Sequence, residues 1–165
     1  MKKACLDLTV SSIDHLNEKY VLIKLTSQDA MPPMAPGQFV EVKVEKSPNT
    51  FLRRPISIHN FDAETNELWL LVARIGDGTR QMGELHVGDT LNCVLPLGNG
   101  FTMPETANKR LLLVGGGVGV APLLYFGAEI KKMGGRPSFL LGARTKTDLL
   151  QLELFEALGD VYVTT

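Results

Sequence analysis

The sequence has few cysteines, no long apolar run and almost no net charge. Its two cysteines, Cys5 and Cys93, lie far apart with no Cys-x-x-Cys spacing, so they offer neither a metal framework nor a disulfide framework, and we expect a reducing, cytoplasmic setting. The apolar runs, such as Leu111–Val114, are far short of the roughly 20 residues that span a membrane, and residues 1–7 do not resemble a signal peptide. The formal net charge of -1 gives no general attraction to nucleic acid or to a membrane surface. We therefore predict neither kind of partner.

The chain does have enough apolar residues to fill a core. Of its 165 residues, 44% are hydrophobic and 21% are charged, which suits one large or two small globular domains. Over residues 1–103, short apolar stretches recur between turn-forming residues, a pattern typical of an antiparallel barrel or sandwich. The expected strands are 4–10, 20–25, 38–44, 55–58, 67–74 and 91–95, with turns at 14–19, 47–49 and 60–66, a proline-rich loop at 31–37 and a tight loop at 96–101.

The stretch Phe51–Ile58 carries two adjacent arginines at the start of an expected strand. Pro55 cannot donate to a sheet ladder, so this strand should lie at an edge, at a bulge or begin there. A guanidinium such as that of Arg53 or Arg54 binds phosphate oxygens bidentately, and the Ser57 hydroxyl follows Arg54 at roughly 10 Å along a strand. This spacing suits a long ligand with phosphate at one end. The alternative is that both arginines are solvated charges beside an ordinary strand.

A glycine-rich turn comes next. Gly76 and Gly78 permit positive φ, and Thr79 is expected to cap a short helix over about 80–85. The free N–H groups at such a helix start form an anion site. The alternative is a capped surface turn without a ligand.

The pattern changes after a polar linker at 104–109. The run Arg110–Val114 is continuously apolar, as in a buried parallel strand. Further strands are expected at 138–142 and 161–163, and helices at 123–133 and 148–158. The order β-α-β-α-β is half of a Rossmann-like sheet. Because three strands leave an exposed parallel edge, we expect the α/β domain of residues 110–165 to be truncated and the natural protein to be longer.

The first of these strands leads into Gly115–Pro122, with the sequence Gly-Gly-Gly-Val-Gly-Val-Ala-Pro. Glycines allow the backbone to approach a pyrophosphate, and the start of the following helix favours its charge. Pro122 suits the first turn of that helix. The alternative is that the glycines serve close packing of helix on strand.

Five short motifs, in order, carry a family resemblance over nearly the whole chain. They are Pro36–Phe39, Leu52–Ile58, Gly76–Thr79, Pro96–Phe101 and Leu113–Pro122. The set resembles the ferredoxin–NADP reductase superfamily, and within it the electron-transfer subunits of class B dihydroorotate dehydrogenases. No single motif is specific, but the ordered set is.

The resemblance implies an N-terminal antiparallel β-barrel FAD domain at 1–103, followed by a Rossmann-like NAD-binding domain. It implies that Arg54 binds the FAD pyrophosphate and that Ser57, the catalytic candidate, donates to the flavin ring near N5 or O4. The other implied cofactor-binding residues are Pro55 and Ile56 at the ring wall, Val72, Ala73 and Arg74 on the ribityl and adenine side, Gly78 and Thr79 at the pyrophosphate, and Gly115, Gly116, Gly117, Val118, Gly119 and Pro122 toward NAD. Many superfamily members have a stacking aromatic residue where this chain has Ile56.

The implied reaction is hydride exchange between nicotinamide and flavin, followed by single-electron steps to a partner. That partner would be a dihydroorotate dehydrogenase catalytic subunit with its own FMN, in a heterotetramer of pyrimidine biosynthesis. The family's 2Fe-2S cluster takes four cysteines, so it is expected only in a missing C-terminal segment. The alternatives are a ferredoxin:NADP oxidoreductase or sulfide dehydrogenase subunit, and a non-enzymatic barrel module. His59, just beyond Ser57, is interpreted as a satisfied loop histidine rather than a catalytic base.

Overall fold

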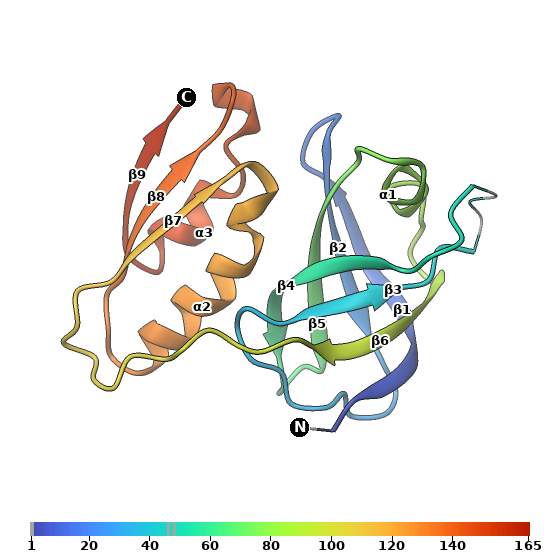
Figure 1. Cartoon of the computed structure of the whole chain (residues 1–165), viewed down its shortest axis with the longest axis horizontal. Coiled ribbons are helices and arrows are strands. Elements are labelled where there is room, and N and C mark those ends of the chain that lie inside the picture. Colours follow the sequence, from blue (N-terminus) through green and yellow to red (C-terminus); the bar gives the residue numbers. More distant parts are fainter. Residues whose placement is uncertain (1, 46, 48) are drawn as a thin grey trace.

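The computed structural model describes residues 2–45, 47 and 49–165, which form a closed barrel followed by a parallel sheet with helices (Figure 1). Pro48, in the predicted turn at 47–49, lies outside these residues. The barrel is antiparallel and closes in the order β1-β2-β5-β4-β3-β6. Its strands are β1 (Ala4–His15), β2 (Tyr20–Thr26), β3 (Phe39–Val42), β4 (Arg54–Asp62), β5 (Glu67–Ala73) and β6 (Thr90–Leu97). The predicted antiparallel barrel is confirmed.

Alternation of apolar and polar residues places one side of each strand inside the barrel. The inward side chains include Leu8, Val10, Ile23, Val40, Val42, Ile58, Leu70 and Val72, all fully buried. Several predicted boundaries were wrong. Strand β4 continues to Asp62, into the turn expected at 60–66, because Asn60, Phe61 and Asp62 still pair with β5. Strand β1 continues through Asp14 to His15, because a bulge near Val10 lets the strand leave β6 and go on pairing with β2. Strand β6 continues through Pro96, which was expected in a loop.

The short helix α1 (Asp77–Met82) begins three residues earlier than expected. Gly76, not Thr79, is the N-cap residue, and its φ of -105° is ordinary for any residue. Thr79 instead holds the turn from inside the helix, because its hydroxyl accepts hydrogen bonds from the backbone N–H groups of Ile75 and Gly76, both at 3.1 Å. Positive φ is also absent at Gly78. Neither glycine of this turn is needed for a left-handed backbone, and only at Gly78 would a side chain be crowded.

The second part of the chain is a three-stranded parallel sheet in the order β7-β8-β9, which confirms the predicted half Rossmann-like pattern. Its elements are β7 (Leu112–Gly116), a 3-10 turn (Gly117–Val120), α2 (Ala121–Lys132), β8 (Ser138–Gly142), a 3-10 turn (Lys146–Asp148), α3 (Leu152–Glu156) and β9 (Asp160–Thr164). The single helix expected at 148–158 is broken, because Gln151 adopts a left-handed conformation at φ 52°. Gly134 has φ +85° just past α2, as expected for a residue that ends a helix.

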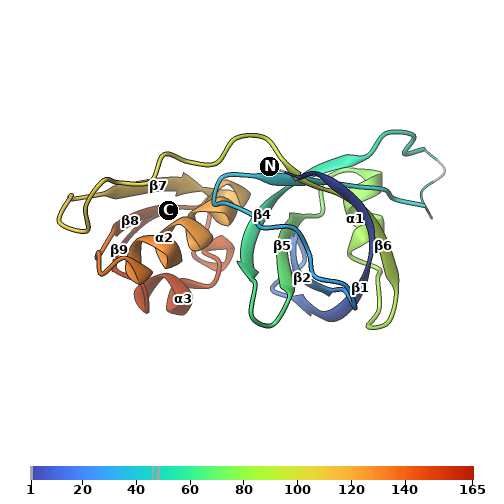
Figure 2. The same ribbon diagram turned by 90° about the horizontal axis from the view of Figure 1, so that it is seen from below.

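Strand β7 is not buried on both faces, as had been expected. Helices α2 and α3 lie on the same face of the sheet (Figure 2), and on the other face Leu112 and Val114 are 60% and 62% exposed. The continuous apolar run therefore does not show by itself that both faces of the strand are covered.

Helix α2 lies between the sheet and the barrel (Figures 1 and 2). Tyr125 belongs to the apolar core of the barrel, where its hydroxyl donates to the Met34 carbonyl at 3.0 Å. Phe126 packs against Phe101 with ring centroids 5.0 Å apart. Leu71 of β5 is part of the apolar cluster of the α/β part. The contact between the two parts is thus largely apolar and buried, which fixes how their facing surfaces meet. Within the described residues, no helix is long and apolar enough to cross a membrane.

Candidate functional site

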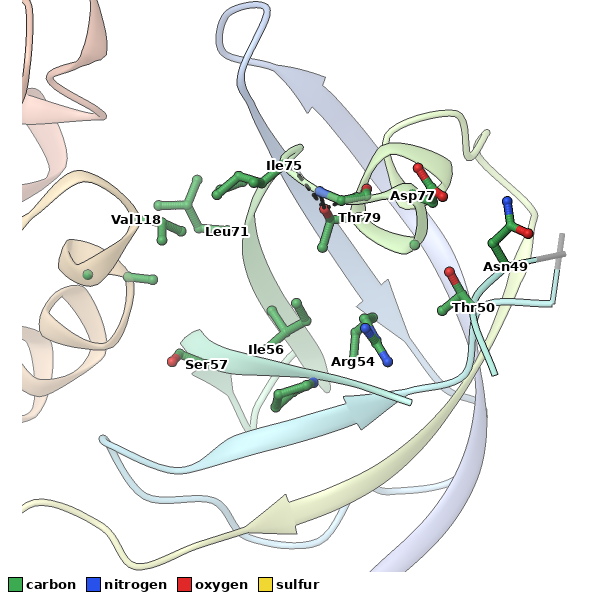
Figure 3. A pocket seen from close by; sticks show the side chains of 16 residues that line it. Asn49, Thr50, Arg54, Ile56, Ser57, Leu71, Ile75, Asp77, Thr79 and Val118 are labelled. Carbon is green, nitrogen blue, oxygen red and sulfur yellow. Dashed lines mark hydrogen bonds between the residues drawn. The ribbon is translucent and has the colours of Figure 1, made fainter. Parts of the chain in front are cut away.

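One cavity lies where two neighbouring strands of the barrel separate. Pairing between β4 and β5 extends over Ile58–Asp62 of β4, with Ile58 opposite Leu70. Before Ile58, the β4 residues from Arg54 onward pair with β3. The end of β5 diverges from them, and the space between is a cavity of about 540 Å³ (Figure 3). Residues 55–57 line one wall and Leu71 and Ala73 line the other.

Pro55 fits this opening. It is the second residue of β4 and lies opposite Glu41 of β3. Because proline has no N–H to donate, a strand edge that faces a cavity tolerates it, whereas a doubly paired strand would not. Three positions were predicted for this proline: an edge, a bulge or the start of the strand. The structure confirms the first, because Pro55 lies on an edge of β4 that does not pair with β5.

The two adjacent arginines have different environments. The Arg53 guanidinium donates to the carbonyl oxygens of Glu41 and Asn92, at 3.2 and 3.0 Å, and to the Asn92 side chain. It therefore links the start of β4 to β3 and β6 and does not line the cavity. Arg54 does line it, and its Nε and Nη2 donate to the Leu52 carbonyl at 3.1 and 2.9 Å. The alternative of two solvated charges is wrong for Arg53, which is a structural residue.

Arg54 lies beside the first turn of α1. A Cβ at Gly78 would come within 3.4 Å of Arg54 Cδ and 3.0 Å of Thr50 Cγ2, so only glycine lets the turn approach this closely. Asp77, Gly78 and Thr79 also line the cavity, and the first N–H groups of a helix have no partner within it. A guanidinium and a set of unpaired N–H groups thus meet at this end of the cavity, opposite the end that carries Ser57 (Figure 3).

The other end of the cavity joins the barrel to the glycine run. Ile56 and Ser57 line it from β4, and Val118, Gly119 and Ala121 line it from the start of α2. A Cβ at Gly119 would meet nothing within 4 Å. The absence of a side chain there leaves the cavity open. In the described part of the chain, no aromatic residue lines this cavity, so Ile56 has no ring-stacking substitute there.

Two roles are divided within the glycine run. A Cβ at Gly115 would clash with Leu123 Cδ1 at 2.8 Å, so this glycine serves the close packing of α2 on β7. Gly117 has φ +54°, which glycine adopts without strain. The packing interpretation is therefore confirmed at Gly115, whereas the approach of the backbone to a pyrophosphate stays a prediction.

A second cavity of about 660 Å³ opens at the carboxyl ends of β7 and β8. Gly116, Gly117 and Gly142 line it, together with the basic side chains of Lys19, Arg74 and Arg144 and with Asp148, which pairs with Lys19. Ligands of open α/β sheets bind outside the carboxyl ends of the strands. Ala73 and Ile75 line both cavities and so form the wall between them.

The predicted site residues therefore divide into three groups. Lining the first cavity are Arg54, Pro55, Ile56, Ser57, Ala73, Gly78, Thr79, Val118 and Gly119, and lining the second are Ala73, Arg74, Gly116 and Gly117. Val72, Gly115 and Pro122 line neither, and the Val72 side chain is fully buried in the barrel core. The sequence reasoning did not assign Asn49, Thr50, Leu71, Ile75, Gly76, Asp77 and Ala121, which line the first cavity, or Lys19, Tyr20, Gly142, Ala143, Arg144 and Asp148, which line the second. Of these, Ala143 and Arg144 come just after the expected parallel strand 138–142, at whose carboxyl end ligands bind, so they could have been found.

The fold is that of the ferredoxin–NADP reductase-like proteins, with a flavin-type barrel and a nucleotide-type α/β part. Among solved structures, the NADH-dependent reduced ferredoxin-NADP oxidoreductase, described for flavin-based electron bifurcation, is similar with a TM-score of 0.82 and 27% identity, over 94% of this chain and 55% of the other. Phthalate dioxygenase reductase is similar with a TM-score of 0.81 and 25% identity, over 98% of this chain and 51% of the other. No protein-family model matches the chain.

Curated relatives make the similarity more specific. The dihydroorotate dehydrogenase B (NAD(+)) electron transfer subunit of Geobacillus kaustophilus (strain HTA426) is 35% identical over 159 residues, which cover 96% of this chain and 62% of the relative. The subunit of the same name from Bacillus cereus (strain Q1) is 42% identical over 131 residues, which cover 79% of this chain and 51% of the relative. The chain is thus homologous to these electron transfer subunits, which confirms the resemblance carried by the five motifs. It spans about half to three-fifths of the relatives' length.

Proposed function

We propose that this chain is the flavin-binding part of a dihydroorotate dehydrogenase electron transfer subunit, an oxidoreductase component that exchanges electrons between NAD(H) and a partner through FAD. The observation that carries the proposal is the opening between β4 and β5. It places Arg54 and the first turn of α1 at one end of one cavity, and Ser57 and Gly119 at the other.

The cavity suits FAD in size and in chemistry. Its volume of about 540 Å³ lies in the range of about 300–1,000 Å³ common for cofactor sites. A guanidinium and unpaired backbone N–H groups favour a pyrophosphate at one end. At the other end, Leu71, Ile56 and Val118 are apolar walls suited to a flat ring (Figure 3). The absence of a side chain at Gly119 leaves room for a second ring to approach.

In this proposal the chain's residues hold and orient the reactants. When bound, FAD would supply the step between two-electron and one-electron chemistry. Arg54 would bind its pyrophosphate, and the N–H groups of Gly78 and Thr79 would add to that contact. The Ser57 hydroxyl would donate a hydrogen bond to the flavin ring near N5 or O4. Gly115–Pro122 would face NAD, whose phosphates would lie toward the basic cavity at Gly116, Gly117 and Arg144.

The domain assignment and the partners follow the same proposal. We assign residues 1–103 to the FAD domain, 104–109 to a linker and 110–165 to the NAD-binding domain. The partner would be a catalytic subunit with FMN, in a cytoplasmic heterotetramer. A 2Fe-2S cluster would need ligands beyond these residues. Burial raises the pKa of the Cys93 thiol to about 12, so this thiol stays protonated and is a poor metal ligand.

Titration of the purified chain with FAD tests the proposal. We expect stoichiometric binding, followed by the flavin absorbance and by quenching of flavin fluorescence. A chain that takes up no FAD would instead be a non-catalytic barrel module. The alternative of a reductase with another partner is favoured by the structural similarity to ferredoxin-NADP oxidoreductase. It is distinguished by adding either a dihydroorotate dehydrogenase catalytic subunit or a ferredoxin to the reduced flavoprotein and following flavin reoxidation.

A further inference from the structure

His59 is fully buried at the boundary between the barrel and the α/β part, two residues after Ser57 on β4. The pairing of β4 with β5 shifts register between Ile58 and Asn60. As a result, Ile58 and His59 are consecutive and both buried: Ile58 belongs to the barrel core, and His59 contacts the α/β part. A bulge of this kind redirects a side chain without ending the strand.

Both ring nitrogens of His59 contact the α/β part. Nδ1 lies 2.7 Å from the carbonyl oxygen of Ala121, and Nε2 lies 2.8 Å from Oε1 of the Gln151 side-chain amide. Ala121 lines the first cavity next to Gly119. Gln151 is one of two non-glycine residues with positive φ among the described residues, a conformation that is unfavourable for a residue with a side chain. Its contact with His59 is one interaction that helps to hold it.

These contacts define the state of the imidazole. Burial is the largest influence on its pKa and lowers it, so the ring is neutral at pH 7 and carries a single N–H. A backbone carbonyl can only accept, so the proton belongs on Nδ1, where it donates to Ala121. Nε2 must then accept. This requires that the Gln151 amide is turned over, so that its NH₂ group takes the place at which Oε1 is drawn.

We propose that His59 is a positioning residue that sets the spacing between the two halves of the electron-transfer site. One half is the strand that carries Ser57. The other half is the 3-10 turn with Gly119 and the start of α2 at Ala121. His59 does not line the first cavity; it acts through the Ala121 carbonyl. The apolar contact through α2 holds the two parts together. The directional hydrogen bond fixes where the start of α2 lies along β4. This inference rests on the proposed function of the cavity.

Two amide variants separate this role from simple packing. In His59→Asn, the side-chain NH₂ occupies the place of Nδ1–H and can still donate to Ala121. In His59→Gln, the NH₂ occupies the place of Nε2, so the Ala121 bond is lost. We expect His59→Asn to keep the rate of flavin reduction by NADH close to that of the unaltered chain. We expect His59→Gln and His59→Ala to lower it by about ten- to a hundredfold, the range for small misplacements of reacting groups. The FAD dissociation constant should change by less than about twofold, because His59 does not line the cavity. The loss of one hydrogen bond to FAD would change this constant by more than that.

Two readouts do not depend on flavin reduction. Imidazole ¹⁵N shifts should identify the Nδ1–H form of His59 at pH 7. Amide hydrogen exchange over residues 119–125 should be faster in His59→Gln than in His59→Asn. His86→Ala serves as the control for loss of a histidine, because the His86 side chain is 86% exposed, and it should change neither readout.

An Nε2–H form, or equal exchange in the two amide variants, would overturn the positioning role. Equal rates of flavin reduction in His59→Asn and His59→Gln would also overturn it, provided that NADH reduces the unaltered chain. If the unaltered chain binds no FAD, the proposed function fails by itself. The ¹⁵N shifts and the hydrogen exchange then still decide whether His59 fixes the start of α2.

Discussion

Ile58 of β4 and Leu70 of β5 form the pair at which these two barrel strands separate. On the side of Arg54–Ser57 of β4 and Leu71–Ala73 of β5, the two strands diverge, and the space between them is the candidate cofactor cavity. In a closed barrel, each strand normally uses its N–H and C=O groups toward both neighbours. Here the start of β4 keeps one edge free for a ligand while the rest of the strand closes the barrel. The site is therefore built from a local departure from regular pairing.

Replacing Arg54 by alanine is predicted to weaken FAD binding by about 1.5–3 kcal/mol, the usual contribution of a hydrogen bond to a charged group. The thermal stability should change little, because the Arg54 bonds reach only its own loop at Leu52 and Arg53. Fluorescence titration with FAD measures the effect. Arg136→Ala, at an exposed arginine before β8, is the matched control and should bind FAD normally. An unchanged affinity in Arg54→Ala would remove its assigned role.

Arg53→Ala should show the opposite behaviour. It removes the bonds to Glu41 and Asn92 that hold β4 to β3 and β6. We expect a loss of about 1–3 kcal/mol in the free energy of unfolding, measured by urea denaturation in the absence of FAD. If instead its stability matches that of the unaltered chain, the two arginines do not divide their roles as the contacts indicate.

Ser57→Ala is predicted to leave FAD binding within about tenfold of the unaltered chain, as one neutral hydrogen bond is lost. The rate of flavin reduction by NADH should fall by at least about tenfold if the hydroxyl stabilises the reacting ring. Stopped-flow absorbance distinguishes the two effects. Ser12→Ala is the control, since Ser12 lies on β1 and contacts Asp14 at the surface. A normal reduction rate in Ser57→Ala would make this serine merely structural.

The sequence was sufficient for the architecture, because alternation and glycine-rich turns are local signals. It also identified Arg54 and Ser57, since a proline within the strand marked the open edge. The residue pattern alone did not separate Arg53 from Arg54, although the family resemblance assigned only Arg54: their difference arises from Asn92, 39 positions after Arg53. For the same reason it could not show that Leu71 lines the cavity or that His59 is buried between two parts of the chain. Both depend on how α2 packs on the barrel.

The glycine run allows a test by addition of single methyl groups. Gly119→Ala should fold normally, because its Cβ meets nothing within 4 Å, yet the methyl group would lie at the opening of the first cavity. We expect slower flavin reduction by NADH with little change in melting temperature. Gly115→Ala is the contrasting variant, since its Cβ would lie 2.8 Å from Leu123 and overpacking typically costs about 1–3 kcal/mol. If Gly119→Ala is reduced at the normal rate, this glycine does not keep room for a reactant.

Stability should depend on pH through His59, in a direction that its buried state defines. Burial lowers its pKa in the folded chain, so below the unfolded value of about 6.5 the unfolded chain binds more protons. The free energy of unfolding should therefore decrease as the pH falls below about 6.5, by at most about 1.4 kcal/mol per pH unit from this group. Urea denaturation between pH 7.5 and 5 measures the slope, and His59→Asn, which cannot titrate, should flatten it. Asp148 gives a separate signal: the bond from Lys19 holds the pKa of its carboxyl below the usual value, so its contribution is lost only near pH 4 and below. An equal slope between pH 7.5 and 5 in His59→Asn and in the unaltered chain would mean that His59 is not buried in its neutral form.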